Sequence, residues 1–271
     1  IGNGSDEVLA HTFLGLLRHE LPIQFPDVTY SFYPVWCDLY GVAYRKVPLA
    51  ADYSVDPDAY AKEHGGIVIP NPNAPTGMAM SLDDIRALLG KNPHAVVVID
   101  EAYIDFGGAS AVPLIAEYDN LLVIQTLSKS RALAGLRVGA ALGQAHLIEG
   151  LERVKNSFNS YPLDCVAQRG AVAALEDVAY FRAICARVVA SRERLARELA
   201  GLGFEVLPSA ANFLLVRYPG REGRVLFSAL RERGIIVRYF DQPRIDDYLR
   251  ISVGTDEQCD ALLAALREIL A

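Results

Sequence analysis

Four short clusters of polar residues carry the chemistry that this sequence could perform. In the most informative one, Lys129 stands in a Ser-flanked turn directly after the apolar run 121–125 (LLVIQ). A lysine amine in such a turn is well placed to form a Schiff base with a carbonyl compound. Ser128 and Arg137 could hold a phosphate nearby, arginine through its planar fork of donors. A lone exposed lysine would carry no such meaning, so the argument rests on the whole string.

A second cluster closes the apolar run 95–99 (AVVVI) with Asp100, and Tyr103 follows three residues later. An acidic residue at the buried end of a strand costs free energy unless a cation pairs with it. A protonated pyridine nitrogen is one such cation, and the Tyr103 phenol could reach an oxygen on the same ring. The alternative interpretation is an aspartate that only caps the next segment.

The other two clusters are less specific. Residues 2–7 (GNGSDE) stand at the start of a predicted helix, whose free N–H groups attract phosphate, although a plain capped helix explains them as well. Residues 71–77 (NPNAPTG) follow the apolar run 66–70, and a loop stiffened by prolines can also be a simple connection.

Helical and strand patterns alternate over the first part of the chain. Helices are predicted at 5–19, 33–43 and 81–89, the last with Ser81 and Asp84 forming a capping box, and strands at 22–25, 43–47, 66–70, 95–99, 121–125 and 138–142. Short, continuously apolar strands between helices indicate a parallel or mixed sheet covered on both faces. Three of the four clusters then stand at the carboxyl ends of strands, where open α/β sheets bind ligands.

The later part of the chain changes character. One long helix is predicted over 166–202, strands over 204–207, 213–216, 235–237 and 249–253, and helices over 222–233 and 256–270. These elements form a smaller α+β unit. The break near Pro162 predicts a large domain at residues 1–160 and a small C-terminal domain at residues 161–271.

Composition limits the classes of function. The 271 residues carry a formal charge of −7 with a pI near 5.3, which argues against nucleic acid or an anionic membrane as partner. The four cysteines form no CxxC pair, so neither a metal site nor a disulfide framework is expected. No apolar run approaches the roughly 18 residues of a membrane span, and the first residues lack the pattern of a signal peptide. A cytoplasmic protein is therefore expected.

Taken together and in this order, the clusters resemble the pyridoxal-phosphate-binding set of fold-type I aminotransferases. Several strings resemble the histidinol-phosphate aminotransferase family in particular, a class II aminotransferase family: GNGSDE, PDVTYSFYPV, NPNAPTG, VIDEAYIDF, LSKSRALAGLRVG, PSAANFLLVR and LRISVGT. The resemblance runs through essentially the whole chain. It implies an α/β fold of the type I pyridoxal-phosphate-dependent transferases, with a large domain built on a mostly parallel central sheet covered by helices and a smaller C-terminal α+β domain.

The resemblance also implies a role for each matching residue. Lys129 would form the Schiff base with the cofactor and shuttle the proton, Asp100 would pair with the pyridinium nitrogen, and Tyr103 would bind the 3′ oxygen of the ring. The remaining expected contacts are Tyr30 stacked on the ring, Asn73 beside it, the backbone at Ser5 and Asp6 with Ser128 and Arg137 at the cofactor phosphate, and Arg238 and Arg250 at the anionic group of the substrate.

The implied reaction is a transamination between histidinol phosphate and 2-oxoglutarate that gives imidazole-acetol phosphate and glutamate, a step of histidine biosynthesis, in a homodimer. Two alternatives stay open. One is a sibling enzyme, an aromatic amino-acid aminotransferase or a threonine-phosphate decarboxylase, which would share Lys129, Asp100 and Arg137. The other is a shortened protein of this fold that binds cofactor without turnover.

The sequence departs from the family pattern in two places. The loop usually reads NPNNPTG, with its second inner Asn contacting the 3′ oxygen, and this position is Ala74 here. Family members also carry an N-terminal segment before the GNGSDE string. From its absence in this sequence we expect exposed apolar surface near the helix at 5–19.

Overall fold

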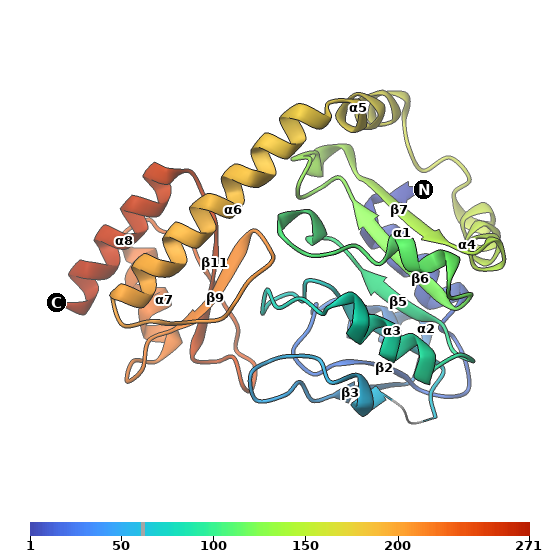
Figure 1. Ribbon diagram of the computed structural model, residues 1–271, viewed down its shortest axis with the longest axis horizontal. Helices are drawn as coiled ribbons and strands as arrows, with labels where there is room; N and C mark the ends of the chain where they lie inside the picture. The colour runs from blue at the N-terminus through green and yellow to red at the C-terminus, as the bar shows by residue number, and fades with distance from the viewer. Residues whose placement is uncertain (61–62) are drawn as a thin grey trace.

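The computed structural model describes residues 1–60 and 63–271, which form two separate β-sheets (Figure 1). The larger sheet has the strand order β1 (Gly2–Asn3), β7 (Val138–Gly143), β6 (Leu121–Thr126), β5 (Val97–Asp100), β4 (Gly66–Pro70), β2 (Ile23–Pro26) and β3 (Tyr44–Val47). The five strands from β6 to β3 run parallel, whereas β7 and β1 are antiparallel to their neighbours. The mostly parallel sheet expected from the sequence is confirmed.

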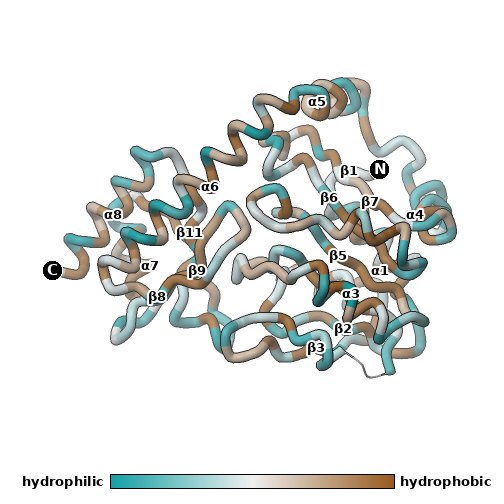
Figure 2. Tube along the Cα trace, in the orientation of Figure 1, coloured by the Kyte–Doolittle hydropathy of each residue, from teal (hydrophilic) through white to brown (hydrophobic). Residues whose placement is uncertain are grey.

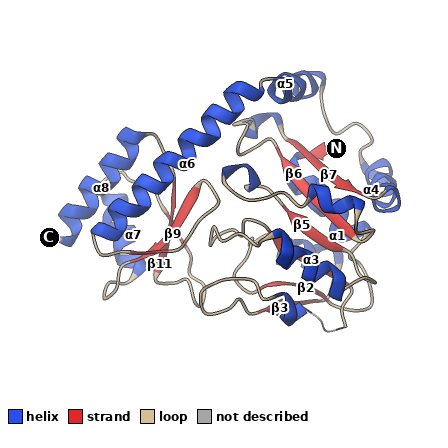
Figure 3. Ribbon diagram, in the orientation of Figure 1, coloured by secondary structure: helices blue, strands red, loops and turns tan. Residues whose placement is uncertain are grey.

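Helices cover both faces of this sheet (Figure 3). One face packs against α1 (Gly4–Gly15), α2 (Tyr33–Tyr40) and α4 (Ala145–Phe158), and the other packs against α3 (Leu82–Lys91) and the 3₁₀ helices η1 (Pro57–Tyr60) and η3 (Val112–Ala116). The side chains of β5 alternate between the two layers: Val98 lies in the first, Val97 and Ile99 in the second. This double covering explains the continuous apolar runs Val97–Ile99 in β5 and Leu121–Ile124 in β6.

The smaller sheet is antiparallel, with the order β10 (Arg238–Tyr239), β11 (Tyr248–Ser252), β9 (Phe213–Arg217) and β8 (Glu205–Val206). The helices α6 (Val178–Gly201), α7 (Gly223–Glu232) and α8 (Asp256–Leu270) share one apolar cluster with Leu214 and Ile251 of this sheet. The opposite side of β9 packs toward the larger sheet, since Leu215 clusters with Val28 and Leu49. Hydropathy follows this arrangement, because β5 is hydrophobic up to the aspartate at its end, whereas hydrophobic and hydrophilic residues alternate along α6 and α8 (Figure 2).

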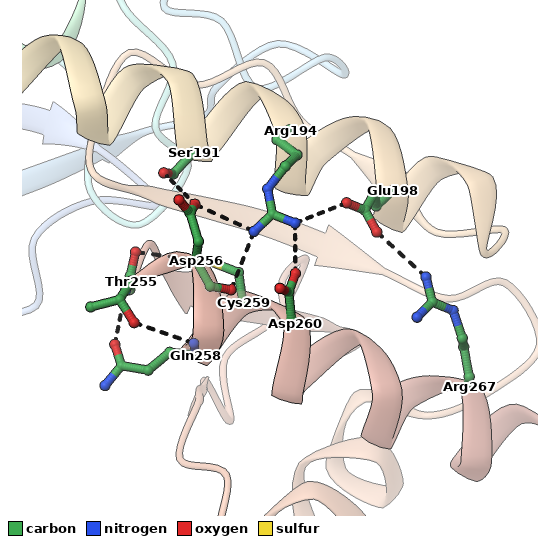
Figure 4. A network of polar contacts seen from close by, with 10 residues as sticks. Ser191, Arg194, Glu198, Thr255, Asp256, Gln258, Cys259, Asp260 and Arg267 are labelled. Atoms are coloured by element: carbon green, nitrogen blue, oxygen red, sulfur yellow. Dashed lines mark hydrogen bonds and ion pairs between the residues drawn. The ribbon is translucent and has the colours of Figure 1, made fainter.

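Polar contacts fasten α6 to α8 on the outside of the smaller sheet (Figure 4). Arg194 of α6 lies 2.6 Å from a carboxylate oxygen of Asp260 and 3.4 Å from one of Asp256. Thr255 caps the start of α8 in a capping box with Gln258. Because these ion pairs are exposed to solvent, screening by water leaves each of them a small contribution to stability.

Several predicted elements need correction. The long helix expected over 166–202 is two helices, α5 (Cys165–Glu176) and α6, because Asp177 leaves the helical conformation and its carboxylate accepts a hydrogen bond from the amide of Tyr180. The strand expected at 235–237 lies slightly later, as β10. The capping box of Ser81 and Asp84 is confirmed.

The exposed apolar surface that the sequence predicts near the helix at 5–19 lies mainly on Ile1 and α5 instead. In the described part of the chain α1 carries no exposed large apolar side chain; Ile1 just before it and Val166, Val172 and Leu175 on α5 are exposed instead. Leu163, Ala171 and Leu175 line an apolar pocket of about 430 Å³ with Ile1 and one side of β7. No described helix combines the length and the apolar character that a membrane crossing requires.

Candidate active site

Residues from all four sequence clusters meet in one cavity at the carboxyl ends of β4, β5 and β6. Its lining is Ser5, Asp6, Leu9, Tyr30, Pro70, Pro72, Ala74, Asp100, Ala102, Tyr103 and Lys129. Parallel pairing brings these strand ends to one edge of the sheet. The first turn of α1 adds Ser5 and Asp6 from the N-terminal end of the sequence. The cavity is therefore at the position where α/β sheets bind ligands.

Asp100, the last residue of β5, lines the cavity. It lies two residues after Val98 and therefore points into the layer of α1 and α2, where the Tyr33 hydroxyl donates a hydrogen bond of 2.9 Å to its Oδ2 atom. The amide of Ala102 donates to Oδ1 at 3.2 Å. Burial raises the pKa of the Asp100 carboxyl to about 6, although both hydrogen bonds act to lower it. This buried acid lacks a cationic partner among the described residues.

Tyr33 is a site residue that the sequence prediction missed. Its side chain is fully buried, and its hydroxyl is the one side-chain donor to Asp100 within the described residues. Burial and the neighbouring carboxylate raise the pKa of the phenol well above its ordinary value, so Tyr33 stays a proton donor. No local pattern marks it, because the residue stands 67 positions before its partner.

Lys129 enters the cavity from the turn after β6, and its Nζ atom lies 5.5 Å from the centre of the Tyr103 ring. No carboxylate of a described residue lies within ion-pair distance of this amine. The turn itself is well supported: Ser128 accepts a hydrogen bond of 3.0 Å from Thr126, and the Ser130 hydroxyl donates to Asp105. A free amine on a fixed turn can attack a carbonyl compound held above Asp100.

The anion-binding end of the cavity lies at the start of α1. The Arg137 guanidinium passes so close to Gly4 that a Cβ atom there would collide with it, and Gly139 likewise leaves no room for a side chain against the amide of Ser5. Two glycines thus bring a guanidinium and a helix N-terminus together. The Asp6 carboxylate contacts two side chains at this end of the cavity. It accepts a hydrogen bond from Arg137 at 2.9 Å and one from the Tyr30 hydroxyl at 3.2 Å.

Two arginines of the smaller sheet lie outside the cavity lining, and one of them is linked to it through aromatic rings. Arg238 and Arg250 are directly opposite each other on β10 and β11. The Arg250 guanidinium lies 5.0 Å from the centre of the Phe213 ring, and Phe213 in turn packs edge-on against Tyr103. Burial and the charge of Arg238 lower the pKa of Arg250, whereas Tyr103 raises it. Like charges directly opposite on neighbouring strands destabilise a sheet, and an anionic ligand relieves this repulsion.

Five predicted site residues are not part of the cavity lining: Asn73, Ser128, Arg137, Arg238 and Arg250. Asn73 is the one whose side chain is held by the loop and by a neighbouring segment. Its side-chain amide is buried and donates to the carbonyl of Val28 and to the hydroxyl of Thr76, both at 3.0 Å. The neighbouring Ala74 lines the cavity instead. The expected contact of Asn73 with a bound ring therefore has no support in this geometry, because the amide nitrogen donates to Thr76 within the loop and to Val28 outside it.

The sequence matches the family "Aminotransferase class I and II" over residues 1–266. The chain belongs to this family. This aminotransferase is 62% identical over 270 residues to histidinol-phosphate aminotransferase 1 of Bradyrhizobium diazoefficiens, covering 100% of this chain and 77% of that protein. It is also 62% identical to histidinol-phosphate aminotransferase 2 of Thiobacillus denitrificans, covering 99% of this chain and 76% of that protein.

A solved structure supports the same relationship. The aminotransferase superimposes with a TM-score of 0.87 on histidinol-phosphate aminotransferase from Sinorhizobium meliloti, a structure in complex with pyridoxal-5′-phosphate; the two are 25% identical, and the match covers 99% of this chain and 76% of that one. The fold expected from the sequence, that of the pyridoxal-phosphate-dependent aminotransferases, is therefore confirmed, and so is pyridoxal phosphate as the cofactor of the family to which this chain belongs.

Proposed function

We propose that this protein transfers an amino group between histidinol phosphate and 2-oxoglutarate, in histidine biosynthesis, with pyridoxal phosphate as cofactor. The observation that carries the proposal is the meeting of Lys129 and Asp100 in one cavity, which the N-terminus of α1 also lines, while Arg250 lies beyond Tyr103 on the Phe213 ring. The names of the relatives, which are 62% identical, support the choice of substrate.

The residues present fit the cofactor. Asp100 is a buried carboxylate whose charge needs a cation, which the protonated ring nitrogen provides. Gly4 and Gly139 open the space in which Arg137 and the amides of α1 meet a phosphate. The backbone amides at Ser5 and Asp6, together with Ser128 and Arg137, would hold that phosphate. Tyr30 and Tyr103 would contact the ring.

The cofactor, when bound, supplies an electron sink for the charge left when a proton leaves the carbon next to the amine. Lys129 would hold the cofactor through Nζ and, once the substrate has replaced it there, would accept and release the transferred proton at the same Nζ atom. Asp100 would hold the ring nitrogen in its positive form, and the hydrogen bond from Tyr33 would favour the ionised form of Asp100. Tyr103 would donate a hydrogen bond to the ring oxygen.

The arginine pair favours an anionic substrate. Histidinol phosphate carries a phosphate and 2-oxoglutarate carries two carboxylates, so one anion site could serve both half-reactions. Arg250 would bind the anion directly, because its Nε atom is buried without a partner among the described residues, and Arg238 would assist.

Replacing Arg250 tests this assignment. We expect Arg250→Met to raise the KM for histidinol phosphate by roughly 10- to 100-fold, because hydrogen bonds to charged groups contribute about 1.5–3 kcal/mol each. Steady-state kinetics measures the change. Arg217→Met is the matched control, since Arg217 lies on the neighbouring strand β9 and pairs with Glu205. An unchanged KM in Arg250→Met would remove Arg250 from the substrate site.

Replacing Tyr33 tests the support of Asp100. Tyr33→Phe keeps the ring in the core and removes only the hydroxyl, so we expect the pKa of Asp100 to rise further and cofactor affinity to fall by about tenfold. Titration with pyridoxal phosphate measures the affinity. Tyr40→Phe, on the same helix, should bind cofactor like the wild type, and equal affinity in all three proteins would contradict the role of Tyr33.

The proposal includes the setting of the enzyme. We propose a cytoplasmic homodimer, supported by the exposed apolar side chains of α5 beside the pocket along β7. We also propose a large domain at residues 1–160 and a small domain at residues 161–271, a division supported by the two separate sheets.

One assay separates the proposed reaction from its alternatives. Purified protein with pyridoxal phosphate and 2-oxoglutarate is given histidinol phosphate, phenylalanine or threonine phosphate, and glutamate and CO₂ are measured. Glutamate formed mainly with histidinol phosphate is the expected result. Glutamate formed mainly with phenylalanine, or CO₂ released from threonine phosphate, would move the assignment to a sibling enzyme. No turnover with any amine would favour a binding protein.

A further inference from the structure

A buried arginine outside the cavity joins the two halves of the site. Arg192 lies on α6 and is only 5% exposed. Its Nη1 atom donates to the carbonyl oxygen of Phe106 at 2.7 Å and to that of Ala211 at 2.9 Å. The Nε and Nη2 atoms of Arg192 donate to the carboxylate of Glu193, the next residue along the helix. These two carbonyls are 86 and 19 positions away in sequence, so the contact is tertiary on both sides.

Each carbonyl belongs to a segment that carries a site residue. Phe106 ends the short helix η2 (Ile104–Phe106), which begins directly after Tyr103. Ala211 stands two residues before Phe213, the aromatic ring that lies under Arg250. Arg192 therefore connects the main chain on the cofactor side to the main chain on the substrate side.

Side chains bridge the same gap. The rings of Tyr103 and Phe213 pack edge-on with their centres 5.1 Å apart. On the far side of η2, the hydroxyl of Ser130 donates to Asp105, which fastens η2 to the turn that carries Lys129. A continuous set of contacts thus runs from the Lys129 turn through η2 and Arg192 to β9.

We propose that Arg192 is a positioning residue that fixes the distance between the cofactor side of the site, Tyr103 and Lys129, and the substrate side, Phe213 and Arg250. The assignment of the two sides rests on the proposed function. The guanidinium suits this task because it is always charged and presents several donors in one rigid plane. Two carbonyls and one carboxylate satisfy it, which a buried charge requires.

Hydrogen exchange tests the link without substrate or cofactor. In Arg192→Met we expect the amides of residues 103–110 and 209–214 to exchange about tenfold faster than in the wild type, because both segments lose a charged hydrogen-bond donor. Arg194→Met is the matched control: it removes a guanidinium two residues away on α6 that contacts Glu198, Asp256 and Asp260 instead. Its effect should be confined to α6 and the start of α8.

Kinetics of the cofactor-loaded enzyme gives the second readout. We expect kcat/KM for histidinol phosphate to fall by about tenfold or more in Arg192→Met, since small displacements of binding groups are costly to catalysis. Arg192→Lys, which can donate to both carbonyls from one nitrogen, should recover part of the loss. Cofactor affinity should change less than kcat/KM, because the groups at the phosphate and Asp100 do not contact Arg192.

The outcomes distinguish this inference from the proposed function. Wild-type exchange in both segments of Arg192→Met, or equal acceleration in Arg194→Met, would overturn the role of Arg192 whatever the enzyme does with substrate. A wild type without transaminase activity would instead contradict the proposed function and leave the exchange result standing. If Arg192→Met does not fold, Arg192→Gln, which keeps an amide donor with a shorter reach, is measured with the same expectation.

Discussion

Lys129→Ala should lower the rate of transamination by about a thousandfold or more, the largest effect that we expect from any single substitution. The variant loses both the covalent hold on the cofactor and the amine that moves the proton. Its Cβ atom remains, and the turn stays fixed by Ser130 and Asp105. We therefore expect normal folding with a lost reaction, measured as glutamate formation together with the unfolding midpoint.

The control for this experiment is another lysine. Lys46 is exposed on β3 and lies outside the cavity lining, so Lys46→Ala should react like the wild type. A Lys129→Ala protein that retains a tenth of the wild-type rate would show that a different group moves the proton, and the assignment of the site would then have to change.

Asp100→Asn should lower kcat/KM by on the order of a hundredfold or more. The variant keeps the shape of the side chain but loses the charge opposite the ring nitrogen, and breaking one partner of a buried ion pair costs about 3–5 kcal/mol. Cofactor titration and steady-state kinetics measure the two consequences. Asp38→Asn, an exposed position on α2, serves as the control. Near-normal turnover in Asp100→Asn would contradict the pairing.

The same carboxyl predicts how stability depends on pH in the protein without cofactor. Burial raises the pKa of Asp100 from an ordinary value of 3.8 to about 6, so the folded chain binds more protons here than the unfolded chain between these values. The unfolding free energy of the wild type should therefore fall, relative to Asp100→Asn, as pH rises from about 4 to about 6, and level off above that. Denaturant unfolding at several pH values measures the difference, and a constant difference would contradict the raised pKa.

The fold was largely predictable because the strong signals are local. Continuous apolar runs such as 66–70 and 121–125 mark strands that are buried on both faces, and the Ser81 capping box marks the start of α3. The split at Asp177 was missed because Ala-rich sequence on both sides favours one helix, and helix propensity alone does not identify where a side chain caps a new turn.

Site residues at the ends of strands could be predicted from the sequence, whereas residues that act through contacts with distant parts of the chain could not. Lys129, Asp100 and Tyr103 line one cavity as expected from their places after β6 and β5. The roles of Tyr33 and Arg192 depend on partners that folding brings from distant positions, so nothing in their own neighbourhood reveals them. Asn73 shows the converse, since a polar residue in a site motif can hold the loop in place, here through Thr76 and Val28, without lining the cavity.

The central claim is that this cavity holds pyridoxal phosphate on Lys129. The most direct measurement adds the cofactor to the purified chain, fixes it with borohydride onto the lysine that holds it, and locates the modification by peptide mass spectrometry. We predict one modified residue, Lys129, with labelling weakened in Asp100→Asn and absent in Lys129→Ala. Modification of another lysine instead, such as Lys46 or Lys155, or no modification at all, would contradict the claim.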